Sequence, residues 1–191
     1  GLDRARRAST IARLLRAGMD RSQIVRQAEA VLRHEFDILG SGPTVLGPRV
    51  DWHCDFKSGH SWPVAVFWKL DHRDLSRNSD VKVPWELSRG HWALWLGVAY
   101  WLTDDERYAI GFVELIDDWL DQNPRGYGVN WQCPMEVAIR AVNWLYAVGL
   151  FFGSPSIPDR LWTRVASSLV WHGDNIRGNL EYGRRLGNHY I

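Results

Sequence analysis

Apolar residues follow two different patterns in the second half of the chain. Residues 104–121 carry one apolar stripe of helical period, with acidic residues on the opposite side, which is typical of a helix at the protein surface. Residues 85–102 and 134–152 are apolar almost all round, which is typical of a helix buried among its neighbours. Buried and amphipathic helices therefore alternate, and the predicted helices are 85–102, 104–122, 134–152 and 158–182.

Local signals mark where these helices begin. Thr103-Asp104-Asp105-Glu106 has the spacing of a capping box, in which Glu106 reaches back to the backbone N–H of Thr103. Pro134 suits the first turn of the next helix, and Pro158 opens the one after it. Short loops between such helices make neighbours antiparallel. We therefore predict an all-α fold, an incomplete (α/α) toroid of antiparallel helical hairpins with the buried helices in an inner ring.

The first 84 residues have a different organisation. Two helices are predicted at 3–17 and 20–36, with Asp20 as the N-cap of the second. Glycine and proline then interrupt a long segment without periodicity, as expected of a loop that has a function or wraps over another element. The chain is thus divided into a helical arm (1–36), an irregular wrapping segment (37–84) and toroid hairpins (85–191) that belong to a larger helical domain continuing beyond the chain.

Composition narrows the class of protein. Of the 191 residues, 46% are hydrophobic and 24% are charged, which is normal for a globular domain and excludes a disordered chain. No apolar run is long enough to predict a membrane span. The net charge of +1 provides no basic field for nucleic acid. No signal peptide is visible, but the chain begins with Gly1 instead of Met, so removal of one stays open.

Cysteine and histidine usage points away from a bound metal. Cys54 and Cys133 form no CxxC motif and no zinc-type ligand set, and two thiols are favoured over a disulfide. The seven histidines are scattered, with none at HxxxH spacing. We therefore expect no metal site in this chain.

Tryptophan is abundant, with twelve residues in the chain. Indoles bury a large area and their N–H groups need polar partners, so most of them are expected in a large helical core. Two or three are expected to line a sugar-binding cleft instead, where the loop residues Asn130 and Trp131 would add contacts to the ligand.

Charged residues interrupt the two buried helices. Glu86 and Arg89 lie at i, i+3 in one helix, and Glu136, Arg140 and Asn143 lie at i, i+4, i+7 in the other. Buried charges are costly unless they are paired. One interpretation is an internal Glu–Arg network that locks the inner helices together. The other is that these charged residues border a central cleft and bind a charged substrate.

Several stretches resemble one enzyme family. Residues 80–89, which read DVKVPWELSR, resemble the DIKxxWELSR signature of the heparinase II/III family of polysaccharide lyases. The loop GVNW at 128–131 and the stretch MEVAIRAVNW at 135–144 resemble the family's next characteristic stretch, and Asn188-His189 resembles its Asn–His pair. The resemblance covers about residues 30–191 and corresponds to the N-terminal portion of the family's helical domain.

The resemblance implies a bacterial enzyme, periplasmic or extracellular, that cleaves a uronate-containing polysaccharide by β-elimination. Its partner would be an acidic polysaccharide: alginate, a heparan-like chain or an exopolysaccharide. In this reaction a hydrogen bond to the uronate carboxylate stabilises the enolate-like transition state, and a base removes the C5 proton. By resemblance Asn188 neutralises the carboxylate, His189 is the base, and no cofactor is required.

The resemblance also implies parts that this chain lacks. The family's acid is a tyrosine well beyond the Asn–His pair, and further neutralising groups come from a C-terminal β-sandwich domain. Tyr190 is not assigned as the acid, because on a helix it points about 100° away from His189. We interpret the chain as a fragment that is inactive alone. Two alternatives stay open: a non-catalytic glycan-binding module, and a toroid glycoside hydrolase that would use Glu86 and Glu136 as its paired carboxylates.

Overall fold

A computed structural model describes residues 4–72, 76 and 78–180, and most of the described chain is helical, as predicted. The elements, with 3₁₀ turns labelled η, are η1 (Arg4–Arg6), α1 (Arg7–Arg16), α2 (Arg21–Leu32), β1 (Glu35–Phe36), β2 (Thr44–Val45), β3 (Cys54–Asp55), β4 (His60–Ser61), η2 (Phe67–Lys69), α3 (Lys82–Ser88), α4 (His91–Thr103), α5 (Arg107–Gln122), η3 (Val129–Trp131), α6 (Pro134–Phe151) and α7 (Asp159–Gly178).

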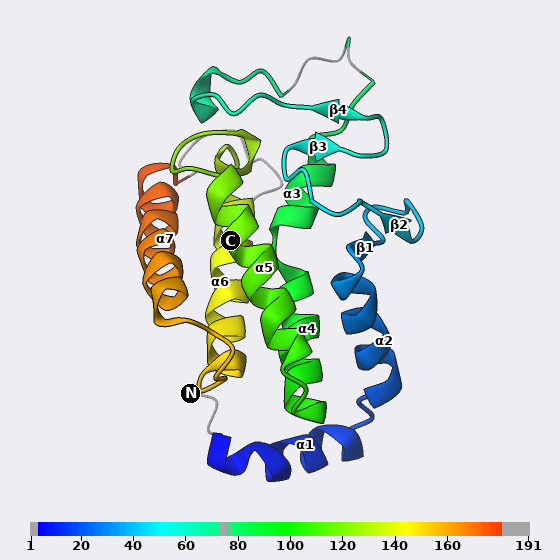
Figure 1. Cartoon of the computed structure of the whole chain (residues 1–191). Coiled ribbons are helices and arrows are strands. Elements are labelled where there is room, and N and C mark those ends of the chain that lie inside the picture. The colour runs from blue at the N-terminus through cyan, green and yellow to red at the C-terminus, as the bar shows by residue number, and fades with distance from the viewer. Residues whose placement is uncertain (1–3, 73–75, 77, 181–191) are drawn as a thin grey trace.

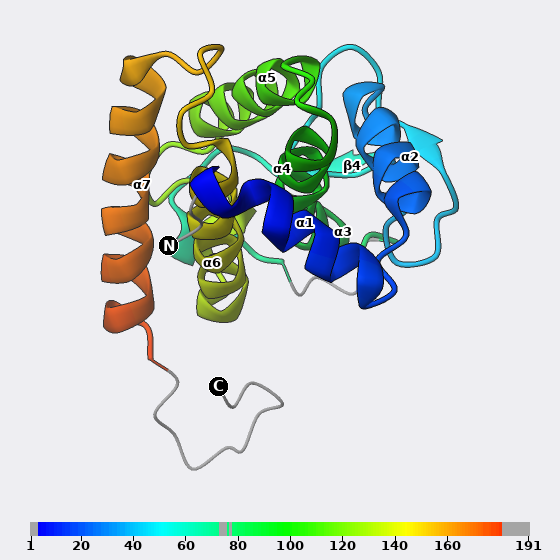
Figure 2. The same ribbon diagram turned by 90° about the horizontal axis from the view of Figure 1, so that it is seen from below.

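The helices α4 to α7 run alternately down and up and pack as antiparallel neighbours (Figure 1). The inner pair α4 and α6 are in contact, α5 packs on α4, α7 packs on α6, and α2 covers another side of α4 (Figure 2). This is the hairpin arrangement of part of an (α/α) toroid, and the predicted all-α fold class is confirmed. We call the end that carries α3, η3 and the last turn of α7 the upper end, as drawn in Figure 1.

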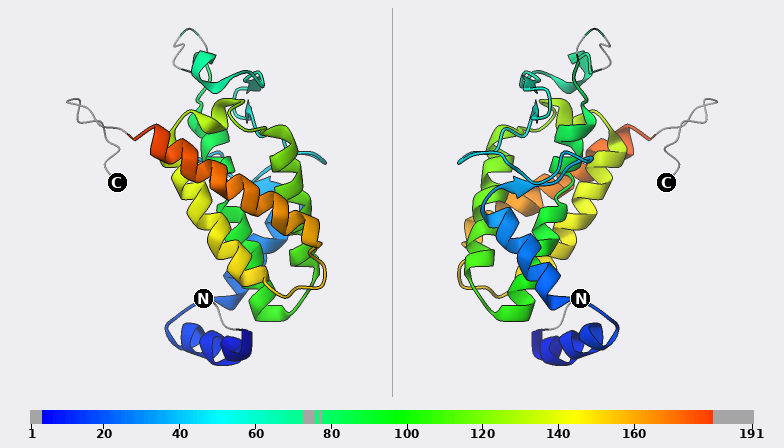
Figure 3. Two further views of the ribbon diagram at one scale, coloured as in Figure 1. Left: turned by 90° about the vertical axis from the view of Figure 1, so that its left-hand side faces the viewer. Right: turned by 90° about the vertical axis from the view of Figure 1, so that its right-hand side faces the viewer.

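The helix α1 lies across the lower end of the bundle (Figure 3). Its Arg7 guanidinium donates hydrogen bonds to the carbonyl oxygens of Trp101 and Tyr100, at 2.7 and 3.1 Å. Arg21 donates to the carbonyl of Leu102 at 3.2 Å. These carbonyls belong to the last turn of α4, where helical partners run out. The Tyr100 carbonyl also accepts from the backbone N–H of Asp104 at 2.8 Å, so the basic arm adds to the capping of a core helix.

The predicted helix 85–102 is wrong in its extent, because the structure divides it into α3 and α4. The break is at Gly90, whose φ of +77° is in the left-handed region that favours glycine. A Cβ atom at this position would lie 3.0 Å from the indole nitrogen of Trp144. Gly90 therefore allows both the turn between the helices and the close packing of Trp144 from α6.

The predicted capping box at residues 103–106 is also wrong. Thr103 is the last residue of α4, and α5 begins only at Arg107. The Thr103 hydroxyl donates to the carbonyl of Ala99 at 2.8 Å, and the Glu106 carboxylate accepts hydrogen bonds from Tyr100 Oη and Ser154 Oγ. Glu106 therefore binds the side chains of Tyr100 and Ser154 instead of the backbone of Thr103. These bonds link α4 to the loop after α6.

The other helix boundaries agree more closely with expectation. Asp20 is the N-cap of α2, since its Oδ1 accepts from the backbone N–H groups of Ser22 and Gln23 at 2.8 and 3.1 Å. The predicted extension of α2 to residue 36 is wrong, because His34 has a φ of +52° and β1 then pairs antiparallel with β2. The helix α6 begins at Pro134 as predicted, whereas α7 ends at Gly178 instead of 182.

The wrapping segment over 37–84 contains β2, the short hairpin of β3 with β4, and η2. The cysteines Cys54 and Cys133 are free, half-buried thiols, so the expected absence of a disulfide between them holds. No helix of the described residues is long and apolar enough to cross a membrane.

Most indoles belong to the core, as predicted. Trp52, Trp92, Trp119 and Trp144 pack in one continuous apolar cluster that runs through α2, α4, α5, α6 and α7. Several indole N–H groups have polar partners, such as the Asp118 carboxylate for Trp52 at 2.9 Å. Trp68 is the clear exception, with 70% of its surface exposed.

The Gly90 turn allows a test of the fold. We expect Gly90→Ala to lower the free energy of unfolding by about 1–3 kcal/mol more than Gly59→Ala, because overpacking adds to backbone strain. Gly59 is a matched control, since its φ of +79° is similar but nothing lies within 4 Å of an added Cβ. Urea unfolding followed by tryptophan fluorescence measures both variants. Equal losses would show that contact with Trp144 is unimportant.

Candidate functional site

The predicted acidic and basic residues of the buried helices meet in an ion-pair cluster of Glu86, Arg89 and Glu136. The Arg89 guanidinium donates to both Glu136 oxygens, at 2.6 and 2.9 Å, and also pairs with Glu86. The Glu136 side chain is only 4% exposed, and those of Arg89 and Glu86 are 22% and 24% exposed. Bidentate bonding by Glu136 is the first cause of a raised pKa of Arg89. This cluster ties α3 to the first turn of α6.

Arg140 has different partners from those that its helix spacing suggests. Its Nε donates to Nε2 of His172 at 2.8 Å, and a terminal nitrogen donates to the carbonyl of Asn130 at 3.0 Å. The guanidinium carbon lies 4.5 Å from the ring centre of Trp119 and 5.4 Å from that of Trp131. The residue is fully buried. Burial lowers the pKa of Arg140 to about 9, so it is still a cation at neutral pH.

His172 is held as a neutral imidazole. Its Nδ1 lies 2.7 Å from the carbonyl of Ser168, so this nitrogen carries the proton, and Nε2 is free to accept from Arg140. Burial first, and the Arg140 charge second, lower the pKa of His172 to about 3. The sequence analysis missed this residue. The available signal was its position at helical spacing from Leu161, Val165 and Ser168 on the buried face of α7.

Asn130 and Trp131 lie on η3 at the upper end, directly above Arg140. The Asn130 side-chain amide donates to the carbonyl of Trp52 and to Oδ1 of Asn123, both at 2.8 Å. Asn130 is 1% exposed and Trp131 is 3% exposed. Both amide hydrogens of Asn130 are therefore used inside the protein, and its role toward a substrate stays a prediction.

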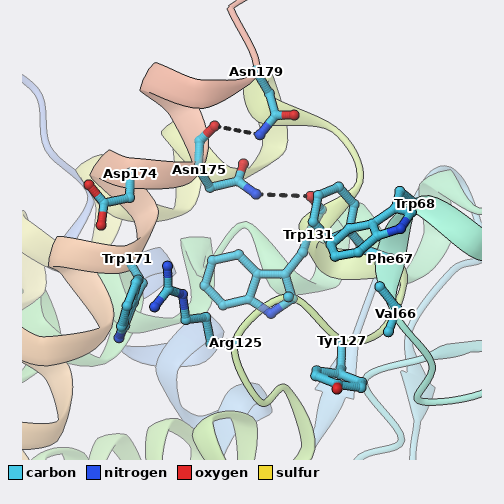
Figure 4. Close-up of a pocket in the computed structure, with 11 residues that line it drawn as sticks. Val66, Phe67, Trp68, Arg125, Tyr127, Trp131, Trp171, Asp174, Asn175 and Asn179 are labelled. Atoms are coloured by element: carbon cyan, nitrogen blue, oxygen red, sulfur yellow. Dashed lines mark hydrogen bonds between the residues drawn. The ribbon is translucent and has the colours of Figure 1, made fainter.

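An open groove of about 340 Å³ lies beside Trp131 at the upper end (Figure 4). We call it the Trp131 groove, and its lining comes from the wrapping segment, the loop before η3 and the end of α7: Val66, Phe67, Trp68, Arg125, Gly126, Tyr127, Trp131, Trp171, Asp174, Asn175 and Asn179. Of these residues, sequence reasoning named only Trp131. The exposed indole of Trp68 agrees with the expectation that a few indoles line a cleft.

The two charged residues that line this groove, Arg125 and Asp174, have different kinds of partners. The Arg125 guanidinium lies over the face of the Trp171 ring, and within the described residues it forms no ion pair. Asp174, the acidic residue of the lining, lies 3.7 Å from Arg177. No group of three or more His, Cys, Asp or Glu residues that could hold a metal ion occurs among the described residues.

Comparison with known proteins identifies the family. Residues 5–191 match the family model for the heparinase II/III N-terminus. The chain belongs to the heparinase II/III family. The family resemblance predicted from residues 80–89, 128–131 and 135–144 is therefore confirmed.

Individual relatives agree with the family match. The chain is 28% identical over 170 residues to a heparin-sulfate lyase of Pedobacter heparinus, covering 86% of this chain and 22% of that protein. The crystal structure of a heparan sulfate lyase HepC mutant from Pedobacter heparinus matches with a TM-score of 0.66 and 26% identity over 87% of this chain. The chain thus spans about a fifth of the length of the relatives that it matches, 22% and 23%.

The predicted catalytic pair, Asn188 and His189, lies outside the described residues. The family match includes both positions, and α7 ends at the upper end with Gly178, ten positions before Asn188. Their catalytic roles, and the substrate-binding roles of Asn130, Trp131, Glu86, Arg89, Glu136 and Arg140, stay predictions.

The buried His172 makes a prediction about pH. Its pKa in the folded state, about 3, lies below the ordinary value of 6.5, so the unfolded chain binds more protons between these pH values and stability falls as pH falls. Lowering the pH from 6.5 to 5 should cost about 1.5 kcal/mol through this residue. The measurement is urea unfolding at both pH values for the protein and for His172→Gln, whose side chain can still accept from Arg140.

Between pH 6.5 and 5, His172→Gln should lose about 1.5 kcal/mol less unfolding free energy than the unmodified protein. His91→Gln is the control for removing one histidine, since His91 is exposed at the start of α4, and it should behave as the unmodified protein does. If the unfolding free energy of His172→Gln fell with pH as steeply as that of the unmodified protein, the neutral, buried state of His172 would be contradicted.

Proposed function

We propose that this chain is part of a lyase that cleaves a uronate-containing, heparan-like polysaccharide by β-elimination. The observation that carries this proposal is the family match over residues 5–191, together with a relative named as a heparin-sulfate lyase. The relative is bacterial, and a polymeric substrate favours a periplasmic or extracellular enzyme.

The proposed chemistry needs only proton transfers. His189 removes the proton at C5 of the uronate, and the Asn188 amide donates a hydrogen bond to the carboxylate that takes up the developing charge. The electron pair of the broken C–H bond forms a C4–C5 double bond as the C4–O bond breaks. An acid from the longer protein protonates the leaving oxygen. The products are an unsaturated uronate and a new chain end, so no metal or redox cofactor enters the balance.

The contacts at the upper end support a scaffolding role for this chain. Arg140 connects η3 to α7 through Asn130 and His172, and α7 leads toward the catalytic pair in sequence. Catalytic groups must be held within a fraction of an ångström of the positions that the reaction requires. A rigid connection between η3 and α7 would serve this requirement.

The structure offers different support to the two alternatives. Glu86 and Glu136 both pair with Arg89 inside the protein, whereas a hydrolase needs two carboxyl groups that flank the bond to be cleaved. The ion pairs therefore give no support to the glycoside hydrolase hypothesis. A non-catalytic glycan-binding module is favoured by one observation, the Trp131 groove, which forms without residues 188 and 189.

The proposal is tested on the full-length protein incubated with heparan sulfate. We expect unsaturated uronate at the new chain ends, measured as near-ultraviolet absorbance. His189→Ala should lower the rate by about 10²–10⁴ through loss of the base, and Asn188→Ala should lower it by about 10²–10³ through loss of a charge-stabilising donor. His91→Ala, at the exposed start of α4, is the matched control and should retain full activity.

Three other outcomes would contradict the proposal. Undiminished elimination by His189→Ala would remove this residue from the mechanism. Reducing ends without unsaturated product would indicate a hydrolase. Binding of the polysaccharide without any cleavage by the unmodified full-length protein would indicate a glycan-binding module.

A further inference from the structure

We propose that the Trp131 groove is a carbohydrate subsite that binds an acidic pyranose, and that Arg125 recognises its anionic substituent, a carboxylate or a sulfate. The acidic polysaccharide is taken from the proposed function, but binding at this subsite does not require cleavage. Three features of the groove favour such a ligand: exposed aromatic side chains, an exposed arginine stacked on an indole, and lining residues with polar atoms that have no partner.

Two aromatic residues of the groove are exposed although the core has room for many indoles. Trp68 is 70% exposed and Tyr127 is 44% exposed, and they lie on different sides of the buried Trp131 (Figure 4). Exposed aromatic residues gathered around one hollow indicate a binding surface. The flat ring faces suit the C–H faces of a pyranose, whose hydroxyl groups point outward from the ring edge.

Trp68 is exposed but fixed in position. Its ring packs edge-on against Phe67, with ring centres 5.0 Å apart. The backbone N–H of Phe67 donates to the carbonyl of Gly126 at 3.0 Å, and the Gln132 amide donates to the carbonyls of Phe67 and Leu70 at 2.9 and 2.8 Å. Because η2 is held to the loop on both sides of η3, the aromatic wall is formed before any ligand binds, which reduces the entropy cost of binding.

Arg125 is presented as a recognition group. Its guanidinium is stacked on Trp171, so the N–H groups at the edge of its plane are available, and the turn that carries it is closed by the backbone hydrogen bond from Tyr127 to Pro124 at 3.0 Å. An arginine stacked on an aromatic ring keeps its planar fork of donors. That fork matches the oxygen atoms of a carboxylate or sulfate. The carboxylate of Asp174 lies in the same lining, 3.7 Å from Arg177.

Two polar atoms of the lining residues have no partner among the described residues. They are the indole nitrogen of Trp131, a donor, and Oδ1 of Asn175, an acceptor. Buried polar groups are nearly always hydrogen-bonded in native proteins, so each unmet group needs an explanation. Sugar hydroxyl groups both donate and accept hydrogen bonds, so a pyranose offers partners for both atoms, which it reaches once the side chains that cover them shift.

The shape of the surface suits a polymer. A second hollow of about 340 Å³ shares Arg125, Trp131 and Trp171 with the groove and continues along α7 past Ser167 and Arg164. The stacked pair of Arg125 and Trp171 therefore stands between two neighbouring hollows. Such a surface can contact consecutive sugars of one chain, with Arg125 at the junction between them.

The subsite is tested by binding, in the full-length protein with His189→Ala to prevent cleavage. The probe is a heparan sulfate octasaccharide, and calorimetry gives the dissociation constant. Arg125→Gln should weaken binding by about 10–100-fold through loss of charge-assisted hydrogen bonds. Arg160→Gln is the matched control, because Arg160 is 68% exposed at the other end of α7, and its variant should bind within about twofold of the parent.

A second pair of variants tests the aromatic wall. Trp68→Ala should weaken binding about tenfold through lost apolar contact. Phe152→Ala is its control, since Phe152 is 74% exposed at the lower end, beyond the last residue of α6. Thermal unfolding of both variants shows whether a loss of binding comes from a loss of fold. Unchanged binding by Arg125→Gln and Trp68→Ala, or no binding by the parent, would overturn the proposal.

Two modified probes, a carboxyl-reduced and a desulfated octasaccharide, show whether Arg125 binds a carboxylate or a sulfate. If Arg125 binds a carboxylate, the penalty of Arg125→Gln should vanish with carboxyl-reduced octasaccharide and persist with the desulfated one. The reverse result would identify a sulfate. A penalty that persists with both probes would overturn anion recognition by Arg125. Failure of the lyase proposal is seen separately, as absence of unsaturated product from the unmodified enzyme, and leaves this binding result intact.

Discussion

The full burial of the Arg140 guanidinium is the constraint on which the rest of this structure depends. A cation removed from water is tolerated only where other groups replace its hydration. The ring nitrogen of His172 and the carbonyl of Asn130 bind two of its nitrogens, and the ring of Trp119 covers its face, whereas its Nη1 atom has no partner among the described residues. Because these groups come from α5, α7 and η3, one side chain of α6 determines how three other elements are placed. Asn130 extends the connection to Trp52 in the wrapping segment.

The charged residues of the inner helices form two separate contacts instead of one stripe. Glu136 stands one helical turn before Arg140, yet its carboxylate binds Arg89 beyond the Gly90 turn. The helix α6 is therefore joined to α3 by Glu136 and to α7 by Arg140. These contacts support the interpretation of an internal network that locks the helices together. They leave the exposed Arg125 and Trp68 as the residues best placed to meet a ligand at the upper end.

The sequence predicted those features that depend on local periodicity. Apolar spacing identified the buried α6 and the one-sided α5, and Asp20 was recognised as a cap because its partners are two and three residues away. The failures involve partners distant in sequence. Glu106 is bound by Ser154 across 48 positions. The Trp131 groove joins three segments that no periodicity relates, so the twelve indoles showed that a cleft was plausible but not which indole would be exposed.

The floor of the Trp131 groove is buried and rigid, whereas its rim is exposed. The floor of the groove rests on Trp131, whose ring contacts the bonded pair of Arg140 and His172, with 4.9 Å between the ring centres of Trp131 and His172. The rim is made of exposed side chains on short turns, which can change without disturbing the buried network. A scaffold of this kind can keep its helices while the residues of its rim change. In agreement with this, Glu86, Arg89 and Glu136 lie in the motif stretches 80–89 and 135–144 and are paired inside the protein, whereas Arg125 and Trp68 on the rim lie outside the motif stretches.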